Sequence, residues 1–418
     1  MIVTAAKPTE ISLAPKFISS LPDHGNHSSA AAVTRIVFLG SFGPPSLTFA
    51  RSCRSMGIAT YLLEPNAGKV IGAMQRSCYA GFRKLSPNAI GTALGIEEVL
   101  QYISETNAGA ITAISDAHTI WLARNADRFA GLCKLMIPSL QCLEFVESKM
   151  RQIEVAKKEG FNVLPTYLLT CMSDIGRIEK RHFPVCLRPS RPDSVSPTFK
   201  AKAIEDKIEL AGYLSGVHHF GEGIIAQPFF PFPNGILHCT SGEDGQLVDC
   251  KAFLVDRKFE GLTLRVRPMS VPRELMPKVA ALSLTLHLAG PYHFDFLVSP
   301  DGEWYFLDLN VRFGGTTEKV FRLGMDEPAN CLAAYGMNPP QLPRKPQVSW
   351  RPVVNKRALL KHILRLFQSA PDALDYPPGS RLSGTLRSLR DLILARDSIA
   401  DWSDIRGTLA FHLQGLIR

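Results

Sequence analysis

Two carboxylates and one carboxamide stand in an otherwise apolar stretch, "HFDFLVSPDGEWYFLDLNVRFGG", at residues 293–315. The letters SPDG in its middle are turn formers, so the flanking residues are expected to pair as a β-hairpin. In the simplest register Val298 lies opposite Glu303, and Asp295 lies opposite Phe306.

Alternation of side chains then places Phe306, Asp308 and Asn310 on one face, with Asp295 projecting onto the same face. Hard oxygen donors grouped in this way suit Mg²⁺, which prefers a few carboxylates plus substrate phosphates to a full protein cage. The alternative is that both carboxylates are hydrogen-bonded edge residues with no ligand. It is disfavoured because unpaired carboxylates among apolar neighbours are costly. Those neighbours are Phe294, Phe296, Leu307 and Leu309.

The rest of the chain must position this hairpin. Residues 34–64 have the pattern of a strand, a helix and a second strand. A strand followed by a helix recurs in residues 108–129. Residues 34 to about 135 therefore predict a small parallel α/β domain. Residues 139–159 predict one long helix. From about 140 to 340, strands and helices alternate without strict β-α-β order, which predicts a mixed α+β architecture.

A nicotinamide site is one alternative for the first of these domains. Glu64, at the end of the second predicted strand, could hold a ribose. However, the turn "GSFGPP" lacks the G-x-G-x-x-G pattern, and Pro44 and Pro45 occupy it. This alternative is therefore disfavoured.

The length of 418 residues predicts more than one domain. The composition, with 45% hydrophobic and 20% charged residues, is typical of a globular protein. No apolar run approaches the roughly 18 residues that cross a bilayer. Residues 1–33 lack the pattern of a secretory signal and are expected to be a disordered leader. Nine cysteines without a C-x-x-C pair favour reduced thiols and a cytoplasmic location.

The net charge of +9 is concentrated at the C-terminal end. Residues 341–418 hold 13 Lys and Arg against 6 Asp and Glu, which gives +7. A solvated basic face explains this excess better than nucleic-acid binding. The same segment is expected to be helical and to dock on the protein through one apolar face, in preference to binding a membrane surface. That face comprises Leu359, Leu360, Ile363, Leu364 and Phe367.

The strand "LDLNVR" resembles the acid-x-Asn-x-Arg motif of the ATP-grasp superfamily, whose other metal carboxylate precedes it, here as Asp295 thirteen residues earlier. The resemblance covers about 34 to 340. It includes the helix "ESKMRQIEVAKKEGFNVLPT" and the stretch "IIAQPFF", which is similar to the segment that joins the two lobes and holds adenine. It implies a small α/β domain followed by a two-lobed ATP-grasp domain and a helical C-terminal appendage. The expected segments are 1–33 (leader), 34–140 (preceding α/β domain), 141–225 (small lobe), 226–340 (large lobe with the metal site) and 341–418 (helical segment).

The resemblance also implies ATP and Mg²⁺ as cofactors. It assigns Asp295, Asp308 and Asn310 as Mg²⁺ ligands, and Arg312 as the cation that stabilises charge on the reacting group. Arg188 is the second expected catalytic cation. It stands where the family usually has a lysine, and guanidinium can still bind phosphate.

Nucleotide contacts are implied for Lys149, Arg188, Ser190, Gln227 and Phe229. Lys149 and Arg188 match the two phosphate-binding cations of the family, and Gln227 and Phe229 match the adenine pocket. Ser190 opens a loop, "SRPDSVSPTFK", without the glycines that usually close over phosphates. The groups expected to substitute for them are the hydroxyls of Ser190, Ser194 and Ser196 and the cation of Arg191 or Lys200.

The implied function is an ADP-forming ligase that activates a small carboxylate as an acyl phosphate and couples it to an amine. The departures at Arg188, in the loop after it and at Asp308, where glutamate is commoner, leave one alternative open: a nucleotide-binding scaffold that performs no ligation. The expected partners are ATP and small carboxylate and amine substrates, with no nucleic acid and no membrane span. A homodimer is left open, and the acyl donor and nucleophile cannot be read from the sequence.

Overall fold

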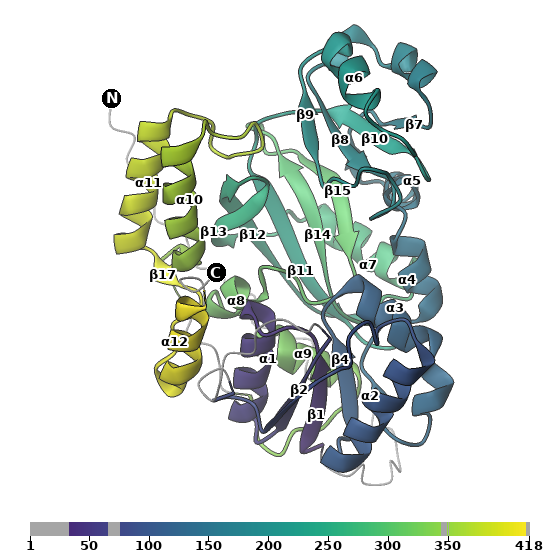
Figure 1. Ribbon diagram of the computed structural model, residues 1–418, viewed down its shortest axis with the longest axis vertical. Helices are drawn as coiled ribbons and strands as arrows, with labels where there is room; N and C mark the ends of the chain where they lie inside the picture. The colour runs from purple at the N-terminus through teal and green to yellow at the C-terminus, as the bar shows by residue number, and fades with distance from the viewer. Residues whose placement is uncertain (1–32, 66–75, 344–348, 350, 415–418) are drawn as a thin grey trace.

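The computed structural model describes residues 33–65, 76–343, 349 and 351–414, and three β-sheets organise it (Figure 1). Almost all of the predicted leader, 1–33, lies outside the described residues. Among the described helices, none is long and apolar enough to cross a membrane.

The first sheet is parallel, with five strands in the order β3-β2-β1-β4-β5. Ile36 and Phe38 pack on one face with residues of α1, and Val37 and Leu39 pack on the other with residues of α2. Burial on both faces explains why β1 is apolar throughout. The predicted parallel α/β unit is confirmed. Its elements are β1 (Arg35–Leu39), α1 (Pro44–Ser55), β2 (Ala59–Glu64), β3 (Gly81–Lys84), α2 (Ala93–Thr106), β4 (Ala110–Ala113), α3 (Asp116–Arg124) and β5 (Lys134–Leu135).

The second sheet is antiparallel, with four strands in the order β7-β10-β8-β9, and forms a small lobe at the upper right of Figure 1. Leu210 and Leu214 share a buried cluster with Ile224 and Ala226, so α6 covers one face of this sheet. The lobe comprises β7 (Tyr167–Leu169), β8 (Val185–Pro189), β9 (Lys202–Ile204), α6 (Lys207–Leu214) and β10 (Ile224–Pro228).

The third sheet is mixed, with eight strands in the order β17-β16-β13-β12-β11-β14-β15-β6. Val279 and Leu282 of α7 share the main hydrophobic core with Phe294 and Phe296 of β14. The predicted mixed architecture is confirmed. Its elements up to residue 334 are α4 (Leu140–Val146), α5 (Lys149–Lys158), β6 (Asn162–Val163), β11 (Asn234–Ser241), β12 (Leu247–Phe259), β13 (Leu262–Met269), α7 (Leu275–Thr285), β14 (Gly290–Val298), β15 (Trp304–Asn310), α8 (Thr317–Arg322) and α9 (Glu327–Ala334).

The single long helix predicted over 139–159 is wrong, because the chain breaks between α4 and α5. The side chain of Ser148 caps the N-terminus of α5. The backbone N–H of Lys149 donates to the carbonyl oxygen of Ser190, at 2.8 Å. The break therefore makes Lys149 the first residue of a helix that is tied to the small lobe.

The C-terminal segment docks on the large sheet, as expected. Its strands β16 and β17 extend the sheet edge. Asp391 also accepts hydrogen bonds from Arg257 at 2.7 Å and from Arg265 at 3.0 Å, and all three side chains are largely buried. The elements are β16 (Val353–Val354), α10 (Lys356–Gln368), α11 (Arg381–Leu394), β17 (Arg396–Asp397) and α12 (Ile405–Leu413).

The single apolar docking face predicted on α10 is only partly correct. Leu359 and Ile363 are buried, but Leu360, Leu364 and Phe367 are exposed. The five residues span more of the helix circumference than one packing contact covers. A second apolar stripe of α10 therefore faces away from the protein.

We expect Asp391→Asn to destabilise the protein by about 3 kcal/mol, because it leaves two largely buried guanidinium groups without their shared carboxylate. The midpoint of urea unfolding measures the change. The same substitution at the exposed Asp127 serves as the control. Equal midpoints for the two variants would show that the buried pair does not anchor the C-terminal segment.

Candidate functional site

The β14–β15 hairpin pairs Asp295 directly with Asp308, so the predicted register is wrong. Val298 pairs with Trp304 because the turn is longer than predicted. The register then shifts a second time beside Asp295, where a β-bulge leaves Leu307 as an extra residue. The bulge brings the two carboxylates onto directly opposite positions.

The bulge also removes Phe306 from the face on which it was predicted. Phe306 pairs with Phe296, and both rings are fully buried in the core behind the sheet. Asp308 and Asn310 instead line a cavity of about 340 Å³. The prediction that Phe306 shares a face with Asp308 and Asn310 is therefore wrong. The grouping of these two residues with Asp295 holds, since Asn310 Nδ2 donates to Asp295 Oδ2 at 3.4 Å.

One cation lies directly against this group. Lys149 Nζ donates to Asp308 Oδ2 at 2.6 Å, across the cleft from α5 to β15. Asp308 Oδ1 is buried and has no hydrogen-bond partner among the described residues. An orphaned carboxylate oxygen in such a position is an unused ligand.

The surroundings shift the pKa values of the two carboxylates in opposite directions. Burial, followed by repulsion from Asp308, raises the pKa of Asp295 to about 6. Burial would also raise the pKa of Asp308, but Lys149 and Arg188 outweigh it and lower that pKa below its usual value. Asp295 is therefore the more easily protonated carboxylate of the pair, and Asp308 the less easily protonated one.

These residues fit a hard divalent cation. They offer an orphaned oxygen, a second carboxylate directly opposite and a neighbouring amide. Among the described residues no group of three or more His, Cys, Asp or Glu side chains could hold a metal ion. Two carboxylates and an amide are what Mg²⁺ uses when phosphates and water complete its shell. The site thus fits Mg²⁺ bound together with a phosphate compound.

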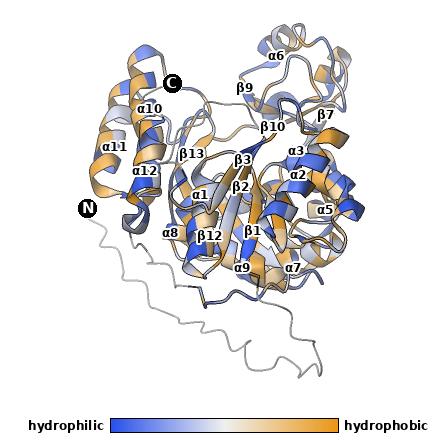
Figure 2. Ribbon diagram, turned by 60° about the horizontal axis from the view of Figure 1, so that its bottom comes forward, coloured by the Kyte–Doolittle hydropathy of each residue, from blue (hydrophilic) through white to orange (hydrophobic). Residues whose placement is uncertain are grey.

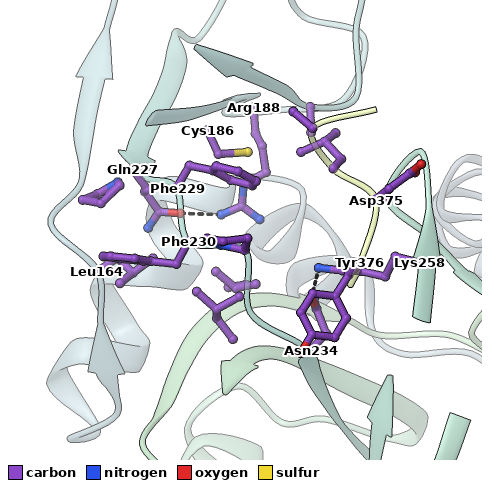
Figure 3. Close-up of a pocket in the computed structure, with 18 residues that line it drawn as sticks. Leu164, Cys186, Arg188, Gln227, Phe229, Phe230, Asn234, Lys258, Asp375 and Tyr376 are labelled. Atoms are coloured by element: carbon purple, nitrogen blue, oxygen red, sulfur yellow. Dashed lines mark hydrogen bonds between the residues drawn. The ribbon is translucent and has the colours of Figure 1, made fainter. Parts of the chain in front are cut away.

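A second cavity, of about 210 Å³, lies between the small lobe and the large sheet (Figure 3). Its walls include Cys186 of β8, Phe229 and Phe230 after β10, and Leu297 and Leu307 of the hairpin. A narrow, mostly apolar cavity with a few polar groups suits a planar ring. The residue released by the bulge, Leu307, thus lines this cavity beside the carboxylate pair.

Arg188 and Gln227 face each other in the same cavity, as Figure 3 shows. Arg188 donates to Gln227 Oε1 at 2.7 Å, and Gln227 Nε2 donates to the hydroxyl of Thr166 at 2.9 Å. The backbone N–H of Phe229 is also engaged, since it donates to the carbonyl of Pro184 at 2.7 Å. The predicted residues Arg188, Gln227 and Phe229 are therefore brought together, with their hydrogen-bonding groups partly satisfied.

Sequence reasoning missed the far wall of this cavity. Lys258 Nζ donates to Asn234 Oδ1 at 2.7 Å, and burial lowers the pKa of Lys258 to about 8. Asp375 and Tyr376, from the loop between α10 and α11, line the cavity beside it. Lys258 and Tyr376 exchange backbone hydrogen bonds. No local pattern marks these residues, because more than a hundred positions separate the two segments.

A second missed residue is Asp116, at the start of α3. Arg312 Nε donates to Asp116 Oδ1 at 2.7 Å, and its terminal nitrogen lies 3.3 Å from Asn310 Oδ1. Asp116 lines the 340 Å³ cavity together with Lys149 and Asp308. The preceding α/β unit thus contributes a carboxylate to this cavity, whereas Arg312, which bonds to it, lines a separate small cavity with Pro291 and Phe313.

Ser190 is placed differently from the other predicted residues. It is buried, its carbonyl fixes the start of α5, and it is not among the described residues that line either cavity. Arg191, next to it, pairs with Glu147 and Glu222. A nucleotide contact from Ser190 stays a prediction.

The raised pKa of Asp295 predicts a pH effect on the metal-free protein. The folded state binds this proton more tightly than the unfolded state, so stability falls as pH rises from about 4 to about 6. Asp295→Asn should remove that loss and stabilise the protein by about 2 kcal/mol at pH 7, with little effect at pH 4. Urea unfolding in EDTA measures it, with the exposed Asp301→Asn as the control. An Asp295→Asn variant no more stable than wild type at pH 7 would contradict the raised pKa.

Comparisons by sequence find no relatives. No protein-family model matches the chain. The search of curated proteins also finds no match.

Comparison of structures does find similar chains. One is the biotin carboxylase domain of Hydrogenobacter thermophilus 2-oxoglutarate carboxylase in complex with MgADP, ADP and bicarbonate, with a TM-score of 0.60 and 16% identity, covering 76% of this chain and 72% of that one. Another is N5-carboxyaminoimidazole synthetase from Staphylococcus aureus, with a TM-score of 0.56 and 14% identity, covering 76% and 80%. A third is the ADP complex of PurK, an N5-carboxyaminoimidazole ribonucleotide synthetase, with a TM-score of 0.59 and 13% identity, covering 87% and 98%.

At identities of 13 to 16% these similarities establish the fold. The parallel α/β unit, the small antiparallel lobe and the large mixed sheet follow one another as the sequence resemblance implied. The chain has the ATP-grasp fold.

Proposed function

We propose that this chain is an ATP-dependent, ADP-forming ligase that activates a small carboxylate as an acyl phosphate and couples it to an amine. The observation that carries the proposal is the bulged hairpin, which puts Asp295 opposite Asp308, with Asp308 lining the larger of two cavities and Leu307 lining the smaller. Structural neighbours with MgADP or ADP bound support the nucleotide assignment.

The narrow cavity is the proposed base pocket. Phe229 and Leu307 would pack against the planar ring, and the Gln227 side chain would offer polar recognition at its edge. Arg188 would turn from Gln227 towards the phosphates. It already bonds to Gln227 in this pocket, and its charge lowers the pKa of Asp308. The guanidinium group of Arg188 can bind two phosphate oxygens at once.

The carboxylate pair is the proposed metal site. Asp295, Asp308 and Asn310 would hold Mg²⁺, which supplies positive charge to the phosphates when bound. Lys149 would then exchange its carboxylate partner for a phosphate oxygen. In the ligand-free protein Lys149 serves as the countercharge of Asp308, at 2.6 Å.

The larger cavity is the proposed reaction chamber for the carboxylate and the amine. Arg312 would stabilise the negative charge that develops on the reacting group, as a preorganised cation. Asp116, which lines this chamber, accepts a hydrogen bond from Arg312 Nε at 2.7 Å. The α/β unit that supplies Asp116 therefore takes part in forming the site.

A second candidate function is nucleotide binding without ligation. Two features favour it. Arg191 is already paired with two glutamates, and the loop from 190 to 200 has none of the glycines that usually close over phosphates. ADP release from ATP that depends on an added amine separates the two functions. A scaffold would bind ATP but release no ADP with any amine and carboxylate pair.

We expect Asp308→Ala to reduce ADP formation by more than about a hundredfold while the protein stays folded, because it removes a ligand of the metal. Circular dichroism and an ADP-release assay measure the two properties. Asp301→Ala, in the exposed hairpin turn, is the matched control. Turnover retained by Asp308→Ala at saturating Mg²⁺ would remove the metal role from this residue.

Arg188 gives a graded prediction. Arg188→Lys should raise the KM for ATP less than Arg188→Ala, because ammonium keeps the charge but loses the two-pronged contact. We expect the alanine variant to lose about tenfold or more in apparent affinity. Initial rates over a range of ATP concentrations measure this series. Identical KM values in the three proteins would exclude a phosphate contact.

A further inference from the structure

Two neighbouring helices of the C-terminal segment expose apolar side chains in regular stripes. On α10 the stripe is Leu360, Leu364 and Phe367, which are 52%, 62% and 71% exposed. The spacing of four and three residues places them along one side of the helix. On α11 the exposed residues are Leu382, Leu386, Leu389, Ile393 and Leu394. We call these eight side chains the hairpin face, after the helical hairpin of α10 and α11; the name does not refer to the β14–β15 hairpin.

The protein side of α11 is largely polar. Its fully buried residues are Ser388 and Asp391, and both bond to Arg257 at 2.8 and 2.7 Å. Leu392 packs against the small cluster of Leu264, Val354 and Leu359, whereas the five exposed apolar residues of α11 contribute little to its docking. Figure 2, coloured by hydropathy, shows the apolar segments that run along α10 and α11. A soluble protein rarely leaves so many large apolar side chains in water unless something covers them.

The charges of the two helices are predominantly basic, although Arg365 of α10 pairs with the exposed Glu260 at 3.0 Å and Asp372, in the loop after α10, is also exposed. α10 contains no acidic residue, and the one acidic residue of α11, Asp391, is buried. Lys361, Arg381 and Arg390 are exposed, and each adjoins a leucine of the hairpin face in sequence. Basic residues beside an apolar stripe are typical of segments that lie on anionic bilayers.

We propose that the hairpin face docks on an anionic membrane surface, with its leucines and Phe367 in the headgroup–acyl boundary and its basic residues on lipid phosphates. This inference is independent of the proposed ligase activity. A second copy of the chain would bring like charges together, which opposes pairing through this face. The leader is a poor cover, because residues 1–32 carry two lysines against one glutamate and one aspartate.

Co-sedimentation of the full chain with vesicles tests the proposal. The probes are vesicles of equal parts phosphatidylcholine and phosphatidylserine, and vesicles of phosphatidylcholine alone. We expect binding to the first, loss of most of that binding at high salt, and little binding to the second. No binding to the anionic vesicles at low salt would overturn the proposal.

Two double variants separate the apolar and charged contributions. Leu364→Ser with Phe367→Ser should weaken vesicle binding by about tenfold or more. Arg381→Glu with Arg390→Glu should abolish the preference for anionic lipid. Ile208→Ser, at an 84% exposed position on α6, is the apolar control, and Lys180→Glu is the charge control. Unchanged urea midpoints show that the variants are folded.

The other occupants of the face give different results. A dimer in light scattering that Leu364→Ser with Phe367→Ser converts to a monomer, without vesicle binding by wild type, would assign the face to a second copy. Vesicle binding that arises only when residues 1–32 are deleted would assign it to the leader. Variants of the hairpin face that bind vesicles as well as wild type would refute docking through these helices.

Discussion

The site depends on two buried carboxylates that face each other in a sheet. A β-bulge creates this pairing by inserting Leu307 and setting Asp295 opposite Asp308. Lys149 forms an ion pair with Asp308 at 2.6 Å. Burial, followed by repulsion from Asp308, raises the pKa of Asp295 to about 6. A divalent cation between the two carboxylates would offset both effects.

The three sheets serve this arrangement. The large sheet presents the pair, and its core of Phe294, Phe296 and Phe306 keeps the hairpin rigid behind it. The break before α5 brings Lys149 to the pair from the side of the small lobe. The first α/β unit reaches the same cavity through Asp116. The C-terminal segment contributes Tyr376 to the lining of the 210 Å³ cavity, while α10 and α11 present apolar residues outward.

Much of this could be predicted from sequence, because some signals are local. Alternating and continuous apolar patterns indicated the strands, and the acid-x-Asn-x-Arg strand marked Asp308, Asn310 and Arg312. Register was not predictable, since a bulge changes pairing without changing composition. The helix break at Ser148 was missed because apolar periodicity continues on both sides of it. Contacts such as Asp116 with Arg312 depend on tertiary packing of distant segments, which one sequence does not encode in any local pattern.

A crystal structure of the protein with ADP and Mn²⁺, with anomalous scattering to locate the metal, tests the central claim most directly. Mn²⁺ takes the same oxygen ligands as Mg²⁺ and can be identified by its anomalous signal. We expect a peak bound by the carboxylates of Asp295 and Asp308 and by a phosphate oxygen, with adenine beside Phe229. ADP bound in the cleft with no metal between these two carboxylates, or ADP bound elsewhere on the chain, would contradict it.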